Sequence, residues 1–394
     1  MTPDRMTMAR RVFFHVQHLL GIGHLRRAAM LSRAMIESGL EVTVASGGAP
    51  VIEAPMPGRL VQLPPARAAD ETFSAILTEE GRPIDDAWQA HRRDILLRAF
   101  AQCAPEVLLI ELFPFGRRAF RFELLPLLEA AAAQRPRPGI ACSVRDILVA
   151  KNNPARTAET VALLRRYFDA VLVHGDAALV PFSASFAGHG AIADLVSYTG
   201  YVVEPAPAAG TAGRGEVIVS AGGGSVGLPL LRAALAARPL SQAAGLTWRL
   251  ITGPNLPAAA VAELNGAAGS GVVVERFRAD FRGLIANCTL SVSQAGYNTV
   301  MDVLAAHARA VLVPFASGGE TEQPLRARIL TERGLAQTVM PNELSPPTLA
   351  AAIDRALARP PSRLDLALDG AMTTARQIAD LAAVAAAGRI GLRP

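Results

Sequence analysis

The sequence predicts an α/β protein made of two doubly wound domains, each with a mostly parallel sheet. Three observations support this prediction. The chain has 394 residues, which is long for a single hydrophobic core. Hydrophobic residues make up 51% of it and charged residues 19%, which is enough apolar material for two cores. Short β-rich runs also alternate with amphipathic helical segments along both halves, as in parallel βαβ units.

The first half of the chain predicts one open sheet. Its strands are expected at VFFHV (12–16), EVTVAS (41–46), EVLLIEL (106–112), IACSV (140–144) and AVLVHG (170–175). Helical periodicity falls between them, at His24–Ser38, Asp86–Phe100, Phe122–Ala133 and Ala155–Phe168. Because the strands are nearly continuous apolar runs, helices should cover both faces of the sheet.

The pattern restarts after residues 197–215, a stretch rich in Pro, Gly and Ala that is typical of an interdomain linker. The strands expected beyond it are EVIVS (216–220), WRLITG (248–253), GVVVERF (271–277), CTLSVS (288–293) and ARAVLVPF (308–315). We therefore predict a Rossmann-like N-terminal domain at 1–198, a linker at 199–215 and a Rossmann-like C-terminal domain at 216–368. A helical segment at 369–394 could cross back to the N-terminal domain.

Composition disfavours several classes of function. The formal net charge of +5 comes mostly from scattered arginines, and no Lys/Arg tract with interleaved aromatics indicates a nucleic-acid partner. Cys103, Cys142 and Cys288 show no CxxC spacing and are expected to be buried free thiols. The first apolar run is interrupted by His15 and Gln17, so it predicts a strand and not a signal peptide. No apolar window of about 18 residues predicts a transmembrane segment, so we expect a cytoplasmic protein.

A glycine pair stands where the first strand meets the first helix, in GIGH (21–24). Free N–H groups and the positive end of the helix dipole favour an anion or a sugar phosphate beside Gly21 and Gly23. The dinucleotide fingerprint G-x-G-x-x-G is not met, because Arg26 stands at the third glycine position and the second strand ends at Ser46 without a carboxylate. A nicotinamide-dependent oxidoreductase is therefore disfavoured.

His24 follows this glycine pair at the start of the helix. The helix dipole disfavours the imidazolium, so the ring should be neutral and able to act as a general base near pH 7. A histidine that only caps the helix is the alternative. Arg26 and Arg27 could meet an anionic substrate or form a solvated helix face.

The second half opens with a longer glycine loop, SAGGGSVG (220–227). Three successive glycines let the backbone wrap around a diphosphate, and Ser225 adds a hydroxyl at the helix start. The loop lacks the GK[ST] of a P-loop, so ATP hydrolysis is not expected. A purely structural turn is the alternative.

Two polar loops lie further along, in SVSQAGYNTVMD (291–302) and GGETEQPLRAR (318–328). The first predicts a strand-to-helix turn, with Asp302 two turns into the helix. The second predicts a polar loop that feeds another helix. Both follow expected parallel strands, whose carboxyl ends form the ligand-binding edge of such a sheet.

Several sequence segments in the second half of the chain match the motifs of a known family. They are the glycine loop, VERFRADF (274–281), S-x-A-G-x-x-T-x-x-D (293–302), VPF (313–315) and E-x-E-Q-x-x-R-A (320–327). Together they resemble the C-terminal domain of GT-B glycosyltransferases, especially family 28, the family of the UDP-N-acetylglucosamine transferase of lipid II synthesis. YTGYVV (198–203) resembles the family's hinge, with Tyr201 where Asn is usual. GIGHLRRA resembles its first N-terminal loop and also the G-x-G-H-x-x-R segment of nucleotide-sugar hydrolases on the same scaffold. The resemblance implies a GT-B fold, with two Rossmann-like domains facing a central cleft.

The resemblance also implies a donor site for a nucleotide-diphosphate sugar in the second domain. A carboxylate such as Asp302 accepts two hydrogen bonds, as the vicinal diol of a ribose requires, although the family more often has Glu there. Solvated helix charges are the alternative for Asp302 and Glu322. The implied donor residues are Gly222, Gly223, Gly224 and Ser225 for the diphosphate, Phe277 and Arg278 for the nucleobase, Asp302 for the ribose, Ser293, Gly296 and Thr299 for the approach to phosphate and ribose, and Glu322 and Gln323 for the sugar.

The N-terminal domain gives weaker candidates for the acceptor. Glu111, Arg145 and Asp146 follow strands that end at the same edge of the sheet. They could bind the acceptor, and Glu111 or Asp146 could be the catalytic base if His24 is not. Arg117 could meet an acidic or lipid-phosphate acceptor. A structural role is the alternative for each of them.

These residues and the resemblance together imply a hexosyltransferase. It would move a hexosyl group, an N-acetylhexosaminyl group included, from a nucleotide-diphosphate sugar to an acceptor hydroxyl with inversion. UDP is the family's usual donor nucleotide, and a membrane-associated acceptor would place the protein at the inner face of the membrane. No His/Cys/carboxylate spacing indicates a metal, and a diphosphate held by backbone N–H groups needs none, so no cofactor is expected.

Two other functions stay open at this point. One is a nucleotide-sugar hydrolase or epimerase on the same scaffold, in which His24 would activate water or the sugar itself. The other is a non-catalytic module that binds a nucleotide sugar. Composition does not separate these alternatives from a transferase.

Overall fold

The computed structural model describes residues 9–19, 23–51, 55–69, 75–149, 153–204, 207, 210–222, 226–317, 319–361 and 364–390. It divides into two structural units. Unit 1 contains residues 1–202 together with 367–394, and unit 2 contains residues 203–366. The predicted sites on Gly21 and on Gly223, Gly224 and Ser225 lie outside the described residues.

Unit 1 contains a seven-stranded parallel sheet with the strand order β3-β2-β1-β6-β7-β8-β9. Its strands are β1 (Arg11–Val16), β2 (Glu41–Ser46), β3 (Arg59–Gln62), β6 (Val107–Glu111), β7 (Gly139–Arg145), β8 (Ala170–His174) and β9 (Val196–Tyr198). A separate antiparallel hairpin is formed by β4 (Ala66–Ala68) and β5 (Ile76–Thr78). The central strands are those that the apolar runs predicted.

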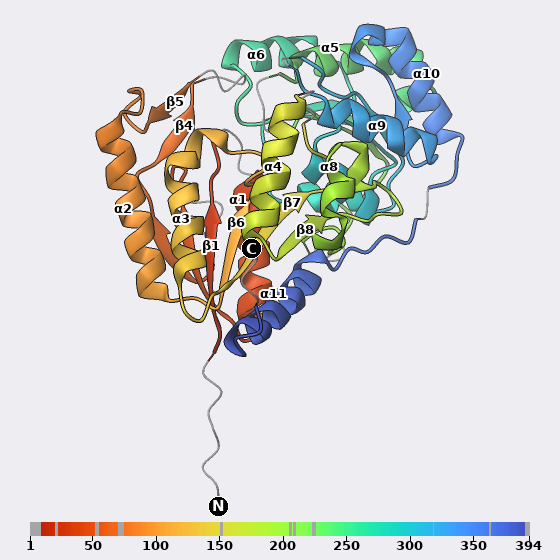
Figure 1. Ribbon diagram of the computed structural model, residues 1–394. Helices are drawn as coiled ribbons and strands as arrows, with labels where there is room; N and C mark the ends of the chain where they lie inside the picture. Colours follow the sequence, from red (N-terminus) through yellow and green to blue (C-terminus); the bar gives the residue numbers. More distant parts are fainter. Residues whose placement is uncertain are drawn as a thin grey trace, which may run out of the picture. The chain divides into compact units, whose positions relative to one another are not determined.

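Helices cover both faces of this sheet (Figure 1). They are α1 (Gly23–Glu37), α2 (Asp86–Cys103), α3 (Arg121–Ala133), α4 (Pro154–Tyr167) and α11 (Gly370–Ala386), with short 3-10 turns at Arg118–Phe120, Phe182–Ala184 and His189–Leu195. Phe13 of β1 points into the core beneath α2 and α3, while its neighbours Val12 and Phe14 pack under α1 and α11. Because α11 packs against α1, the last helix of the chain completes the core of unit 1.

Unit 2 contains a six-stranded parallel sheet with the order β12-β11-β10-β13-β14-β15. Its strands are β10 (Glu216–Ser220), β11 (Thr247–Ile251), β12 (Val272–Glu275), β13 (Leu290–Ser293), β14 (Ala310–Leu312) and β15 (Gln337–Thr338). Its helices are α5 (Leu228–Ala237), α6 (Ala258–Ala267), α7 (Phe281–Asn287), α8 (Tyr297–Ala305), α9 (Glu322–Glu332) and α10 (Pro346–Leu357), with 3-10 turns at Arg238–Leu240, Gln242–Gly245 and Pro341–Glu343. Side chains of α5 and α10 pack with those of β10, β11 and β13 in one core.

Both sheets reverse their strand order at one point, as doubly wound sheets do. The reversal lies between β1 and β6 in unit 1 and between β10 and β13 in unit 2. In open α/β sheets, ligands bind outside the carboxyl ends of the strands at such a switch point. The predicted doubly wound α/β architecture is therefore present in each unit, and each unit offers one ligand-binding edge.

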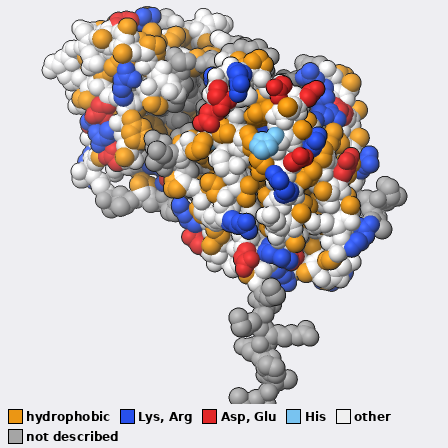
Figure 2. Space-filling model, turned by 90° about the vertical axis from the view of Figure 1, so that its left-hand side faces the viewer, with side chains coloured by type: hydrophobic (Ala, Val, Ile, Leu, Met, Phe, Trp, Pro, Cys, Tyr) orange, Lys and Arg blue, Asp and Glu red, His pale blue; other side chains and the backbone are white. Residues whose placement is uncertain are grey.

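Charged side chains do not gather by sign on the face that Figure 2 displays. Arginines and carboxylates lie interspersed there among hydrophobic side chains. A nucleic-acid footprint would instead be a stripe or patch of one sign. This face therefore shows no such footprint.

Candidate active site

A histidine and a glutamate meet at the switch point of unit 1. His24 is the second residue of α1, which follows β1, and Glu111 is the last residue of β6. Since β1 and β6 are hydrogen-bonded neighbours, the end of one and the helix after the other come together. His24 Nδ1 lies 2.6 Å from Glu111 Oε1. The carboxylate side chain is 1% exposed and the imidazole 21% exposed, so the ring keeps access to solvent.

The charges around Glu111 keep it ionised. Burial opposes its ionisation, but the pKa of Glu111 still lies well below its usual value, because His24, Arg117 and Arg27 surround it. Arg27 Nη2 donates a hydrogen bond to Oε1 (2.7 Å), and Arg117 Nη2 lies 3.7 Å from Oε2. An ionised carboxylate only accepts hydrogen bonds, so Nδ1 of His24 carries the proton. Nε2 of His24 then holds the lone pair.

His24 is neutral near pH 7. Burial lowers its pKa to about 4 and outweighs the attraction of Glu111, while Arg117 and Arg145 lower the pKa further. Arg27 Nη2 also lies 3.2 Å from Nδ1, but its shorter hydrogen bond goes to Glu111. A neutral imidazole with an oriented Nδ1–H can accept a proton at Nε2, and the adjoining carboxylate then stabilises the imidazolium that forms.

The other predicted residues of unit 1 differ in their surroundings. Arg26 is exposed on α1, and Gly23 is the first residue of that helix. Arg145 ends β7 and is half-buried. Asp146 is 1% exposed, and its carboxylate accepts hydrogen bonds from the backbone N–H of Ile147 (2.9 Å) and the hydroxyl of Tyr201 (3.4 Å). These contacts hold the loop after β7, and a catalytic role for Asp146 stays a prediction.

Among the described residues, the end of β2 differs from that of a usual dinucleotide site. A Cβ on Gly47 would lie 2.0 Å from Gln17 Oε1 and 2.2 Å from Arg92 Nη2. A Cβ on Gly48 would lie 2.3 Å from the ring of His18. The place beside the second strand, where a dinucleotide would need a carboxylate for its ribose, is thus filled by protein side chains.

The switch point of unit 2 lies at the second glycine loop. Gly222 has φ +67°, a left-handed conformation that favours glycine at the start of this loop. Ser220 at the end of β10 stands beside Ser293 at the end of β13. Both are buried, and among the described residues their hydroxyls have no hydrogen-bond partner. Gly296 caps the start of α8 in open space, and Thr299 is half-buried one turn further.

Phe277 and Arg278 follow β12 at the same edge of the sheet. The Phe277 side chain is 63% exposed. Arg278 is bound by Asp280, through hydrogen bonds of 2.7 Å from both Nε and Nη2, and it lies 3.4 Å from Glu275. Its guanidinium is therefore held by neighbouring carboxylates, and contact with a nucleobase stays a prediction for Phe277 and Arg278.

The carboxylate of Asp302 on α8 forms an ion pair with an arginine side chain. Arg282 of α7 donates from Nε to Asp302 Oδ1 (2.9 Å) and from Nη2 to the backbone carbonyl of Glu204 (2.7 Å). The two side chains of the Asp302–Arg282 pair are 19% and 21% exposed. A ribose diol at Asp302 would share the carboxylate with Arg282 or displace it. No sequence motif pointed to Arg282.

Glu322 and Gln323 open α9 and are both engaged with protein groups. Glu322 is 4% exposed, and its Oε1 accepts a hydrogen bond of 2.9 Å from Arg326 Nη2. Gln323 Oε1 accepts one of 3.1 Å from the backbone N–H of Phe315. Glu320 caps the helix by accepting hydrogen bonds from the backbone N–H groups of Glu322 and Gln323. Contact with a donor sugar stays a prediction for both residues.

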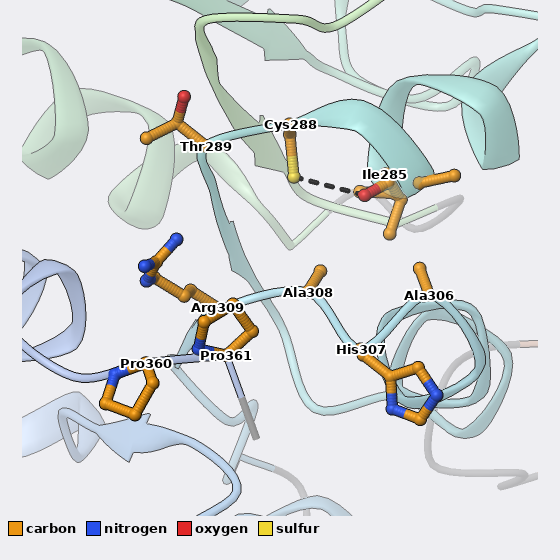
Figure 3. Close-up of a pocket in the computed structure, with 10 residues that line it drawn as sticks. Ile285, Cys288, Thr289, Ala306, His307, Ala308, Arg309, Pro360 and Pro361 are labelled. Carbon is orange, nitrogen blue, oxygen red and sulfur yellow. Dashed lines mark hydrogen bonds between the residues drawn. The ribbon is translucent and has the colours of Figure 1, made fainter. Parts of the chain in front are cut away.

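A pocket of about 880 Å³ lies elsewhere in unit 2 (Figure 3). It is bounded by the ends of α7 and α8 and by the segments that enter β13 and β14, so it opens at the amino ends of these strands. No predicted site residue lines it. Within the described part of the chain, no three His, Cys, Asp or Glu side chains are grouped as metal ligands, and no helix has the length and apolarity to cross a membrane.

Comparisons with known proteins agree with this architecture. Residues 218–382 match the glycosyltransferase family 28 C-terminal domain. The UDP-N-acetylglucosamine--N-acetylmuramyl-(pentapeptide) pyrophosphoryl-undecaprenol N-acetylglucosamine transferase of Xanthomonas axonopodis pv. citri (strain 306) is 33% identical over 191 residues, which are 48% of this chain and 44% of that protein. The match thus spans less than half the length of this relative.

Solved glycosyltransferases share the fold over nearly the whole chain. The calicheamicin glycosyltransferase CalG4 aligns with a TM-score of 0.59 at 16% identity, over 96% of this chain and 95% of its own. The Acinetobacter baumannii MurG structure aligns with a TM-score of 0.58 at 14% identity, over 96% and 99%. The predicted fold class is confirmed: the chain has the GT-B fold, and its residues 218–382 are similar to the glycosyltransferase family 28 C-terminal domain.

Proposed function

We propose that this chain is a glycosyltransferase that moves a hexosyl group from a nucleotide-diphosphate sugar to an acceptor hydroxyl. The observation that carries the proposal is the neutral His24, oriented by the ionised Glu111 at the switch point of unit 1. The match of residues 218–382 to a glycosyltransferase domain assigns the donor to unit 2 in this proposal.

The donor's diphosphate binds at the glycine loop after β10. Backbone N–H groups there, the left-handed turn at Gly222 and the start of α5 favour an anion. Phe277 offers an exposed aromatic face for the nucleobase, and Asp302 offers a carboxylate for the ribose. The backbone N–H groups and the start of α5 stabilise the negative charge that grows on the departing nucleoside diphosphate, and the reaction takes place without a metal.

The acceptor hydroxyl gives its proton to His24 Nε2. As the acceptor oxygen forms a bond to the anomeric carbon, the bond from that carbon to the phosphate oxygen breaks, and the nucleoside diphosphate leaves with the electron pair. The new imidazolium is stabilised by Glu111, which already accepts the Nδ1 hydrogen bond. A single displacement of this kind inverts the anomeric configuration.

The substrates in this proposal are inferred from the name of the Xanthomonas transferase. We propose a UDP-linked donor, an N-acetylhexosamine as the group transferred, and a lipid-linked acceptor, which would bring the protein to the inner face of the membrane. A thermal-shift screen of UDP-, GDP- and dTDP-sugars tests the donor, because a bound ligand stabilises the folded chain.

The matched pair His24→Ala and His91→Ala tests the base. His91 is exposed on α2 and serves as the control. We expect His24→Ala to lower transfer by about 10²–10⁴-fold with unchanged donor binding, since positioned bases contribute about that much. Transfer within threefold of wild type would show that His24 is not the base. Nucleotide release that needs no acceptor would instead identify a hydrolase and overturn the transferase proposal.

A further inference from the structure

Arg92 of α2 is a buried arginine that no sequence motif indicated. Its side chain is 0% exposed, and all five N–H donors of its guanidinium form hydrogen bonds. Nε and Nη2 donate to the two carboxylate oxygens of Glu123 (2.7 and 2.9 Å). Nη1 donates to the backbone carbonyls of Gly47 (2.9 Å) and Pro64 (2.6 Å). Nη2 also donates to Gln17 Oε1 (2.5 Å), so one side chain binds four separate segments of the chain.

These four partners follow four different strands of the unit 1 sheet. Gln17 comes directly after β1, Gly47 directly after β2, and Pro64 two residues after β3. Glu123 lies in the first turn of α3, the helix that follows β6. In a parallel sheet the carboxyl ends of the strands form one edge, which is the ligand-binding edge of this fold class. Arg92 therefore ties together the segments that leave the sheet at this edge.

Two of the four segments carry the His24–Glu111 pair. The segment after β1 leads into α1, whose second residue is His24. Glu111 is the last residue of β6, and the chain that follows it reaches Phe120, whose ring centre lies 5.0 Å from the guanidinium carbon of Arg92. Glu123 then pairs with the same guanidinium. Arg92 thus holds the chain on both sides of the 2.6 Å contact between His24 Nδ1 and Glu111 Oε1.

Stability alone does not account for this arrangement. Glu123 is 0% exposed; burial opposes its ionisation, but its pKa lies below the usual value because Arg92 and His15 stabilise the carboxylate. The desolvation of a buried ion pair often costs as much free energy as its attraction returns, so apolar side chains could fill this space equally well. They could not hold several segments by hydrogen bonds. A Cβ on Gly47 would lie 2.2 Å from Arg92 Nη2, so only glycine lets the backbone approach the guanidinium this closely.

We propose that Arg92 is a positioning residue for His24. Its guanidinium fixes the segment that leads into α1 against the segment that follows β6, and this keeps the Nδ1–H of His24 on Glu111 and leaves Nε2 as the base. A displacement of about 1 Å at a reacting group can lower a rate by about 10²-fold, so the fixed spacing matters for proton transfer. The role in transfer rests on the proposed function. The effect of Arg92 on the His24 ring does not, and the two are measured separately.

Nitrogen-15 NMR of the histidine rings in the full chain measures the effect on His24. The chemical shifts of Nδ1 and Nε2 show which nitrogen carries the proton, and the His24 signals are those that disappear in His24→Ala. In the wild type near pH 7 the proton should reside on Nδ1. In Arg92→Gln and Arg92→Lys we expect it to be shared between the two nitrogens. Lysine keeps the charge beside Glu123 but lacks the planar fork that reaches all four segments.

Arg137→Gln is the matched control, because it removes a similar contact at the opposite edge of the same sheet. The Arg137 side chain is 8% exposed, and its Nη1 donates to Asp169 Oδ2 (2.7 Å). These two residues precede β7 and β8, so they lie at the amino edge. The control should be destabilised in urea unfolding but keep the wild-type His24 spectrum. With octyl glucoside as the acceptor probe, the Arg92 variants should lower kcat by about 10–100-fold and leave UDP affinity unchanged.

Two results would overturn the inference. In one, the folded Arg92 variants give the wild-type His24 spectrum. In the other, Arg137→Gln changes this spectrum as much as they do, which would assign the effect to general destabilisation. If neither Arg92 variant folds, Gln17→Met decides by the same criterion, because it removes one acceptor at similar side-chain volume. An Arg92-dependent His24 spectrum in a chain that binds no nucleotide sugar would refute the proposed function and leave the positioning role standing.

Discussion

Acidification should leave proton transfer by His24 intact down to about pH 5. Burial, opposed by Glu111, lowers the pKa of His24 to about 4. At pH 5 a base with this pKa is about 90% neutral, whereas an ordinary histidine of pKa about 6.5 is only about 3% neutral. The ratio of kcat/KM at pH 5 to that at pH 7 is therefore expected to be about 0.9, and a tenfold fall per pH unit should begin only below pH 4.

Initial rates over pH 4–8 would measure this, with released nucleotide quantified by chromatography and the donor chosen by the thermal-shift screen. Short reactions separate titration of His24 from slow acid unfolding, which circular dichroism at each pH would monitor. A fall in kcat/KM centred near pH 6.5 that disappears in His24→Ala would refute the burial argument. An acid limb that is the same in wild type and His24→Ala would refute the role of His24 as base.

Three further predictions concern stability and the donor site. Burial lowers the pKa of His174 to about 3, below its value in the unfolded chain, so stability is lost as the pH falls below 6.5. At pH 4.5 this amounts to about 2.6 kcal/mol relative to pH 7, and urea unfolding of wild type and His174→Asn at both pH values should show the difference. Gly47→Ala should cost about 1–3 kcal/mol in urea unfolding because its Cβ would meet Gln17, whereas Gly245→Ala, with open space around it, should not. Asp302→Ala should weaken UDP binding about 10–100-fold in calorimetry, and an unchanged affinity would remove Asp302 from the donor site.

The central strands and the main helices of the fold could be predicted from the sequence. Strands such as β1, β6 and β10 are buried on both faces, so they appear as continuous apolar runs. The strands that were missed lie at sheet edges or outside the large sheets. Both β3 and β15 are short and only half-buried or exposed, because an edge strand has one neighbour and packs less apolar surface.

The locations of the candidate site residues could be predicted from the sequence, but the partners of their side chains could not. Glycine loops and strand ends can be read along the chain, and sheet topology brings them to one edge. The partner of a side chain cannot be predicted from its neighbours in the sequence. Arg282 of α7 donates hydrogen bonds to Asp302 on α8 and to the backbone carbonyl of Glu204. Nothing in the spacing of these residues indicates a cation at the carboxylate proposed for the ribose. In the same way, Glu322 is a helix-start carboxylate in sequence but a buried partner of Arg326 in the structure.

The His24–Glu111 pair shows how the fold alters the chemical properties of residues that the sequence had already indicated as candidates. The sequence predicted a neutral His24 because a helix dipole repels an imidazolium, and in the structure burial lowers the pKa of His24 to about 4. Glu111 was considered as an alternative base, yet its pKa is depressed and its oxygens face Arg27 and Arg117. A carboxylate held by cations in this way is a weak base. It is better suited to fixing the His24 tautomer, so in the proposed mechanism His24 takes the proton, and Glu111 orients the ring and stabilises the imidazolium.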